Sequence, residues 1–195
     1  MPRKPTASRH DISHDRILEA AARTMRRDGY AGAGVATVMK QAGLTHGGFY
    51  AHFDSREAML AEAIDYDSQN HDDSLRQRMQ TRIGEGASPF RALVEEYLSE
   101  RHLLESDRGC AVAALASEMV RTDGLLRAAS GRKIQRFIHF VEQSLDARVA
   151  KQDASIIAGA LVGALQMARV LDGEARQGVL QHCRASLLSR FDIVN

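Results

Sequence analysis

Apolar residues recur three and four positions apart along most of the chain, which is the spacing that places them on one face of an α-helix. Ile17, Leu18 and Met25, for example, share a face between charged residues. No segment alternates apolar and polar residues as a half-buried strand does. The pattern therefore predicts an all-α fold of about nine helices, over residues 11–29, 35–42, 45–53, 54–69, 88–104, 109–120, 122–145, 153–171 and 173–190.

Residues with capping side chains mark several of these starts. Thr45 is an expected N-cap of the third helix, and Asp54 with Glu57 resembles a capping pair before the fourth. Ser88 followed by Pro89 is typical of an N-cap and a first helical position. We expect four short N-terminal helices, followed by a larger helical region.

Charge is distributed unevenly along the 195 residues. The whole chain has 26 Lys and Arg against 25 Asp and Glu, whereas residues 1–60 have nine against six, with four of the eight histidines. This mild positive balance points to the N-terminal third as the place to look for a nucleic-acid site. We expect residues 1–10 to form a disordered basic arm.

Composition also narrows the location and the class of protein. Two cysteines are too few for a disulfide framework and fit a reducing cytoplasm. The apolar run over 156–165 is too short to span a membrane, and no apolar segment of a secretory signal follows the basic N-terminus. Scattered histidines and the lack of a phosphate loop or nucleophile elbow predict no metal, cofactor or catalytic site. We expect a cytoplasmic protein that is not an enzyme and has no membrane partner.

Gly47 and Gly48 lie inside the predicted helix in LTHGGFYAHF, although each glycine costs a helix about 0.5–1 kcal/mol relative to alanine. Two explanations are open. The pair forms a turn with unusual dihedral angles, or it keeps one helix face bare so that another molecule approaches closely.

The two short helices over 35–42 and 45–53 are joined by Ala-Gly-Leu-Thr and preceded by a longer helix, which is the arrangement of a helix-turn-helix. Phe49 and Phe53 are four residues apart and share the buried face. His46, Gly47 and Tyr50 then face outward. Absent side chains at the glycine pair would bring the backbone close to DNA, where hydroxyls contact phosphates and His46 reaches a base edge.

The stretch from Arg16 to Ile64, and AGLTHGGFYAHFDSREAMLAEAI above all, closely resembles the DNA-binding domain of tetracycline-repressor (TetR) family regulators. The matching positions are Gly29-Tyr30, Ala42-Gly43-Leu44-Thr45, Gly48-Phe49-Tyr50, His52-Phe53 and Ser55-Arg56-Glu57. The resemblance implies a homodimer that reads a palindromic operator in double-stranded DNA. It also implies a C-terminal effector pocket whose occupancy changes the spacing of the two DNA-binding heads.

By position, Thr45, Tyr50 and Arg56 match phosphate-contacting sites of this family, and His46 and Gly47 match base-facing ones. The chain departs from the family at Ala33-Gly34-Val35, where Thr or Ser usually contacts phosphate. Backbone N–H groups replace that contact, or Thr37 does, or the contact is missing. The predicted DNA-binding residues are Thr37, Thr45, His46, Gly47, Tyr50, His52 and Arg56.

The helix over 153–171 has an unusually small face that includes Gly159 and Gly163. Small residues permit close approach of helices, so this face predicts a dimer interface, unless the helix is simply buried within one subunit. The resemblance favours dimerisation, because the family usually pairs through its last two helices.

Apolar residues of the second region predict a cavity for a small hydrophobic effector, although such residues are often plain core. Cys110 follows Gly109 at a helix start with Arg108 nearby, and both features favour the reactive thiolate. Its placement resembles a branch of the family in which some members sense electrophiles through such a thiol. The predicted pocket and sensor residues are Cys110, Phe90, Tyr97, Leu115, Met119, Phe137, Phe140 and Met167.

The sequence thus predicts a helix-turn-helix DNA-binding domain over residues 11–55 and a helical effector-binding and dimerisation domain over 56–195. The expected function is ligand- or electrophile-responsive regulation of transcription, with repression favoured over activation. A constitutive DNA-binding dimer without an effector is the alternative.

Overall fold

The computed structural model describes residues 8–193 and contains helices and no strand within that range, which confirms the predicted all-α fold. One 3₁₀ helix, η1, lies among nine α-helices. The elements are α1 (Arg9–Gly32), α2 (Val35–Gln41), η1 (His46–Ala51), α3 (Arg56–Gly84), α4 (Pro89–Tyr97), α5 (Glu100–Leu104), α6 (Ala111–Met119), α7 (Gly124–Ser144), α8 (Asp153–Val170) and α9 (Gly173–Phe191).

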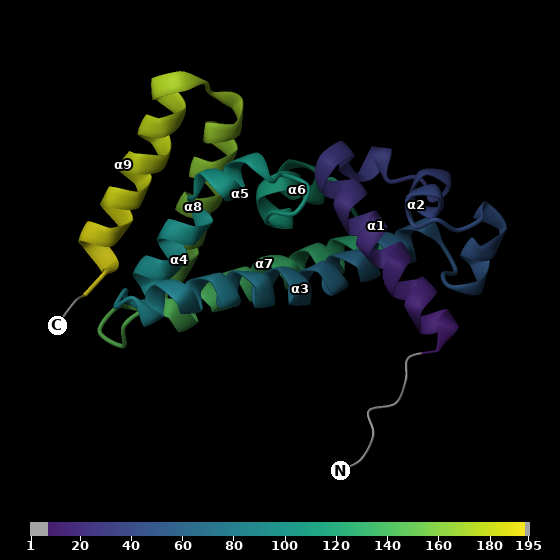
Figure 1. The fold of residues 1–195 in the computed structure, drawn as a ribbon, viewed down its shortest axis with the longest axis horizontal. Helices are drawn as coiled ribbons and strands as arrows, with labels where there is room; N and C mark the ends of the chain where they lie inside the picture. The colour runs from purple at the N-terminus through teal and green to yellow at the C-terminus, as the bar shows by residue number, and fades with distance from the viewer. Residues whose placement is uncertain (1–7, 194–195) are drawn as a thin grey trace, which may run out of the picture.

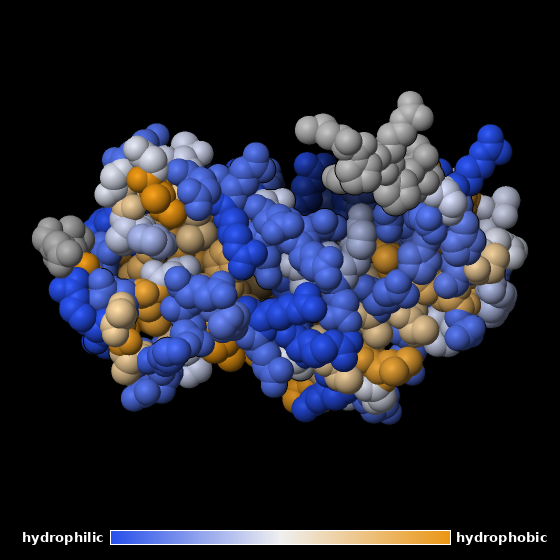
Figure 2. Space-filling model, turned by 90° about the horizontal axis from the view of Figure 1, so that it is seen from below, coloured by the Kyte–Doolittle hydropathy of each residue, from blue (hydrophilic) through white to orange (hydrophobic). Residues whose placement is uncertain are grey.

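The long helices α3 and α7 lie side by side along the molecule, with α1 and α2 at one end and α8 and α9 at the other (Figure 1). Two hydrophobic cores follow this division. One surrounds Phe49 and Ile64 and includes Leu115 of α6, whereas the other surrounds Tyr97 and Leu161. Figure 2 shows a face on which hydrophilic side chains cover the middle of the molecule and apolar patches lie towards both ends.

Helix α1 begins with a capping box in which the Ser8 hydroxyl accepts from the Asp11 N–H and the Asp11 carboxylate accepts from the Ser8 N–H. The helix therefore starts at Arg9, two residues earlier than expected, and residues 1–7 of the predicted arm lie outside the described residues. Gly29 has a φ of +73°, so the predicted end of the helix is a kink, after which α1 continues to Gly32.

Helix α3 is longer than its pattern predicted and extends to Gly84. The helix does not end near residue 69 as expected, and in its continuation the Asp72 carboxylate lies 3.7 Å from the buried Lys133 Nζ of α7, so this charged residue faces a neighbouring helix. The predicted capping pair is also wrong. Ser55 caps α3, while Glu57 accepts from the Leu125 N–H at 2.9 Å and so caps α7.

The predicted helix over 88–104 is two helices. Ser88 caps α4 with Pro89 in the first turn, as expected, but Ser99 accepts from the His102 N–H and starts a separate α5. Helix α8 is the one helix within residues 8–193 that is long and apolar enough to span a membrane. In the fold it packs against α7, α9 and α6, as a core helix of a bundle does.

Candidate nucleic-acid interface and cavity

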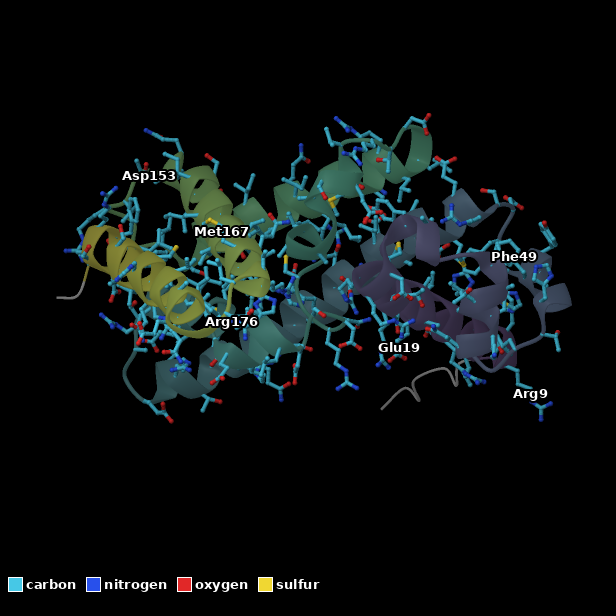
Figure 3. The ribbon with its side chains drawn as sticks, turned by 90° about the horizontal axis from the view of Figure 1, so that it is seen from above. Arg9, Glu19, Phe49, Asp153, Met167 and Arg176 are labelled. Atoms are coloured by element: carbon cyan, nitrogen blue, oxygen red, sulfur yellow. The ribbon has the colours of Figure 1, made fainter. Side chains whose placement is uncertain are left out.

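The segment from Thr45 to Tyr50 lies on the surface at the α1–α2 end of the molecule. Thr45, His46 and Gly47 are exposed, and Tyr50 is 74% exposed. Beneath them, Phe49 is 1% exposed and anchors the segment in the core, at the end of the molecule marked by its label in Figure 3. The predicted inner and outer faces of this element are therefore present.

The backbone angles and the space around Gly47 and Gly48 distinguish the two explanations for the glycine pair, which are unusual dihedral angles and close approach by another molecule. Neither Gly47 nor Gly48 has a positive φ, whereas Gly43 in the preceding turn has a φ of +67°. Among residues 8–193, and apart from the adjoining backbone, no heavy atom lies within 4 Å of the position that a Cβ would occupy at Gly47. Unusual dihedral angles are thus excluded at the pair, and the chain's own packing leaves room for a side chain at Gly47. We retain close approach by another molecule as the explanation.

The element is a 3₁₀ helix and not the predicted α-helix. Thr45 occupies its N-cap position, but the Thr45 side chain makes no capping hydrogen bond. On α2, Thr37 is exposed as well. Hydroxyls of Thr37, Thr45 and Tyr50 therefore face solvent on one end of the molecule, where they can donate to phosphate oxygens.

Two other predicted residues have partners within the chain. Arg56 donates from Nε to the Ala33 carbonyl at 3.0 Å and from Nη2 to the Tyr30 carbonyl, which ties the start of α3 to the α1–α2 connection. The His52 ring centroid lies 4.4 Å from that of His10. Burial, together with the neighbouring imidazoles, lowers the pKa of His52, so this side chain is neutral at pH 7.

The apolar residues that were predicted to line an effector cavity belong to the two cores instead. Seven of them are between 0% and 5% exposed, namely Phe90, Tyr97, Cys110, Leu115, Met119, Phe137 and Phe140. Met167 differs from these residues, since its side chain is 55% exposed on α8. The plain-core alternative therefore applies to the first group, and the surface of α8 accounts for the last residue.

A cavity of about 540 Å³ does exist, but its walls are polar and come from α1, α3, α5 and the connection from α5 to α6. The lining residues come from three separate stretches of the sequence, which include residues 23 and 26, residues 71 and 78, and residues 101 and 108. No sequence motif links the three stretches. Sequence reasoning missed this site for that reason. The lining residues are Glu19, Ala22, Arg23, Arg26, Tyr66, Asp67, Asn70, His71, Ser74, Arg78, Arg101, His102, Glu105, Arg108 and Gly109.

Cys110 lies next to this cavity and is 1% exposed at the N-cap of α6. Its backbone N–H donates to His102 Nε2 at 2.9 Å, and His102 Nδ1 lies 2.7 Å from the Tyr97 carbonyl. Burial and the nearby Cys110 thiol raise the pKa of Tyr97 well above its usual range. Tyr97 and the Cys110 thiol act electrostatically on Arg169 of α8, while Arg108, the cation that the sequence suggested, is exposed.

The far end of α6 contacts the N-terminal end of the molecule. Glu118 accepts from the Tyr30 N–H at 2.8 Å, and a Cβ at Gly29 would lie 2.6 Å from its carboxylate. One short helix therefore joins the Cys110 region to the kink of α1. A displacement of α6 along its axis would move the carboxylate that caps this kink.

Helix α8 presents an apolar face to solvent. Ile156, Met167 and Val170 are 65%, 55% and 84% exposed, and Figure 3 places Met167 at the end of the molecule away from Phe49. Gly159 and Gly163 lie along the same helix, and no heavy atom lies within 4 Å of the position that a Cβ would occupy at either residue. These glycines are therefore not required by packing within one chain. No cluster of His, Cys, Asp or Glu suited to a metal ion occurs among residues 8–193.

Residues 17–63 match the model of the family of bacterial regulatory proteins named tetR. No curated protein sequence matches the chain. The match covers α1 from residue 17 onward, α2, η1 and the first part of α3.

Solved structures with the same fold cover almost the whole chain. Reduced E. coli NemR has 20% identity and a TM-score of 0.73, over 92% of this chain and 97% of that one. Regulatory protein TetR from Rhodobacter sphaeroides has 19% identity and a TM-score of 0.71, over 92% and 99%. AibR in complex with isovaleryl coenzyme A and operator DNA has 18% identity and a TM-score of 0.58, over 89% and 97%.

Proposed function

The chain carries the N-terminal domain of the TetR family of bacterial regulatory proteins on a TetR-type helical fold, and on that premise we propose that it is a transcriptional repressor that binds a palindromic operator as a dimer. A small-molecule or electrophilic effector releases it from DNA. The division into a head over residues 11–55 and a body over 56–195 belongs to the same proposal, with no catalytic step.

The proposal depends mainly on one observation. Helix η1 presents an exposed surface with no side chain at Gly47, and the aromatic ring of Phe49 on its opposite side is buried in the core. Phe49 fixes the helix from below, while Gly47 leaves open space above. In a helix-turn-helix the second helix enters the major groove, where a missing side chain lets the backbone approach the base edges. His46 and Gly47 are the proposed base-facing residues.

Side chains around this face are proposed to hold the phosphate backbone. Thr37, Thr45 and Tyr50 offer exposed hydroxyls from α2 and η1. Arg56 adds a positive charge at the start of α3, although its guanidinium also holds the α1–α2 connection. Such contacts fix the position of a protein on DNA and give little sequence information. His52 belongs to the same surface.

The exposed face of α8 supports dimerisation. Apolar side chains at Ile156, Met167 and Val170 are unfavourable in water and gain free energy when a second copy covers them. The bare glycines Gly159 and Gly163 between them permit close approach of a second helix. A dimer of this kind would present two η1 elements to the two halves of a palindrome.

Helix α6 supports a route from an effector to the head. It starts at Cys110 beside the cavity and ends at Glu118, which caps the kink of α1. Occupation of the cavity or modification of the thiol at one end thus acts on the head at the other. AibR, whose structure holds both isovaleryl coenzyme A and operator DNA, supports a double role for proteins of this fold.

Binding of the protein to the DNA upstream of its own gene tests the proposal. Fluorescence anisotropy should report two chains per site, preference over a scrambled duplex, and a loss of affinity of about a thousandfold or more between roughly 50 and 200 mM salt. Equal affinity for both duplexes would contradict it. Specific binding that no compound, anion or electrophile weakens would instead favour a constitutive dimer without an effector.

A further inference from the structure

The polar cavity lies between the parts of the molecule that the proposed function separates. Glu19, Arg23 and Arg26 come from α1 of the head, while His71 and Arg78 come from the second half of α3. In Figure 3, Glu19 lies between Phe49 at one end and Arg176 at the other. The volume of about 540 Å³ is within the usual range of small-molecule sites.

Its lining does not suit an apolar ligand. Tyr66 and Ala22 are the only aromatic or aliphatic side chains among the lining residues. The charged ones are five arginines and three carboxylates, so the lining carries a net charge of 5 − 3 = +2 with neutral histidines. A ligand that fills this cavity must replace the hydrogen bonds that the guanidinium groups of the lining arginines make with water.

Ion pairs with carboxylates in and behind the wall take up most of this charge. Arg26 is bound to Asp67 and Arg23 to Asp107, while Glu96 behind the wall is shared among Arg78, Arg82 and Arg101 at 3.5, 2.6 and 3.1 Å. Arg82 and Arg101 have second carboxylate partners in Glu95 and Glu105. The 3.5 Å approach is made by the buried Arg78 Nε, which makes no hydrogen bond to any of the described residues, so Arg78 is left without a full acceptor.

His71 supplies the second unmatched group. The residue is 8% exposed, lines the cavity, and its Nε2 has no hydrogen-bond partner among the described residues. A buried imidazole nitrogen of this kind is costly unless a ligand or water completes it. Its ring centroid lies 5.9 Å from that of His102, so two imidazoles line the same wall.

Burial and the cations nearby both lower the pKa values of the two imidazoles. Burial, followed by Lys133, His102, Arg26 and Arg78, lowers the pKa of His71 well below its usual value. For His102, burial and then Arg169, Arg78 and Arg101 lower the pKa to about 4, against a hydrogen bond to Tyr97 that raises it. Both rings are therefore neutral donors or acceptors in a positive field.

We infer that this cavity is a binding site for a small polar anion with a carboxylate or phosphate group, held by Arg78 and His71 with Arg108 at the mouth. Carboxylate and phosphate oxygens accept from guanidinium N–H groups in pairs and with charge assistance. The inference rests on the proposed function for its consequence, because an anion that bridges α1, α3 and the α5–α6 connection sets the position of the head. Binding itself requires no DNA.

Isothermal titration of the full chain with succinate, inorganic phosphate and the uncharged succinamide tests the site. We expect at least one anion to bind, succinamide not to bind, and Arg78→Gln to raise the anion Kd at least about tenfold. Arg76→Gln is the matched control, because it removes the same charge from the same helix at a residue that lines a different hollow. Arg108→Gln, at an exposed position, should also raise the Kd and guards against misfolding of the Arg78 variant.

Histidine-selective ¹⁵N NMR provides a local readout, in which the His71 Nε2 resonance should shift on anion binding and stay unshifted with succinamide. The inference is overturned if neither anion binds, if succinamide binds as well as succinate, or if the control variant loses as much affinity as Arg78→Gln. Operator binding is measured separately on the same samples. Specific DNA binding without anion binding refutes this site alone, and the reverse result refutes the proposed function.

Discussion

At Gly47 the open space beside the backbone makes one substitution a sharp test of the recognition face. Gly47→Leu should fold normally, because no heavy atom lies within 4 Å of the added Cβ and surface substitutions typically change stability by less than about 0.5 kcal/mol. The larger side chain should hold η1 away from the groove and reduce operator affinity to the non-specific level, a loss of about a thousandfold or more. Anisotropy titration with operator and scrambled DNA measures it.

Gly84→Leu is the matched control for this experiment. Gly84 is exposed at the end of α3, also has open space around its Cβ position, and lies outside the head. It should bind operator as the unsubstituted protein does. Normal operator binding by Gly47→Leu would show that close approach of DNA does not explain the glycine.

A second prediction at this scale concerns His102, whose pKa burial lowers to about 4 from an ordinary value of 6.5. The unfolded chain therefore binds more protons than the folded protein between these values. Stability is fully present above about pH 6.5 and falls as the pH falls towards 4. Urea unfolding should show a loss of about 2 kcal/mol between roughly pH 7.5 and pH 5 from this group, and the buried His71 acts in the same direction.

The variant His102→Gln should lose clearly less stability over the same interval, because it removes the group that titrates. His182→Gln, at an exposed position on α9, should keep the full pH dependence. The same loss in all three proteins would mean that His102 is not its source.

At the scale of residues, the sequence predicted the two faces of η1 but not the polar cavity. The outward positions of His46 and Tyr50 and the burial of Phe49 follow from spacing alone, because one short helix on a core has only one inner face. The cavity does not follow from spacing. Arg26, His71 and Arg78 meet through the packing of α1 on α3, and no local pattern encodes that packing.

At the scale of elements, prediction succeeded where a local signal ended a helix. Ser88 with Pro89 and Gly43 mark a helix start and a turn that the structure contains. It failed where a distant contact decided the outcome. The helix predicted over 54–69 continues past its expected end, where Asp72 pairs with Lys133 of α7. Glu57 was expected to cap its own helix, yet it caps α7.

Helix α6 carries the prediction for the thiol. Addition of N-ethylmaleimide to Cys110 places a bulky group where the side chain is 1% exposed, so α6 must shift from its contact with Tyr97 and from the capping of Tyr30 by Glu118. Operator affinity should then fall in the unsubstituted protein and in Cys183→Ser, but not in Cys110→Ser. Mass spectrometry confirms the site of addition and anisotropy measures the affinity. Equal loss in both cysteine variants, or no loss in any protein, would remove the thiol switch.

At the scale of the whole molecule, the proposed DNA-recognition face and the proposed pairing face lie at opposite ends. The α1–α2 end carries η1, whereas α8 and α9 form the other end (Figure 1). Long α3 and α7 connect the two ends, and the polar cavity lies between the ends, where α1, α3, α5 and the α5–α6 connection line it. In the proposed dimer, a change in the cavity would therefore alter the angle of each head while the paired ends stay fixed, and this would change the spacing of the heads at the operator.

Gly163→Leu tests that arrangement. Within one chain the added side chain meets open space, so the folded subunit should remain intact by circular dichroism. In a dimer through α8 it should overpack a close helix contact, at a cost of about 1–3 kcal/mol for each copy of the substitution. Light scattering should show a shift towards monomer, with a parallel loss of operator affinity because one head alone contacts half a palindrome. Gly131→Leu makes the same change on an exposed, open position of α7 and should keep the dimer. A fully active Gly163→Leu dimer would place the interface on another face of the molecule.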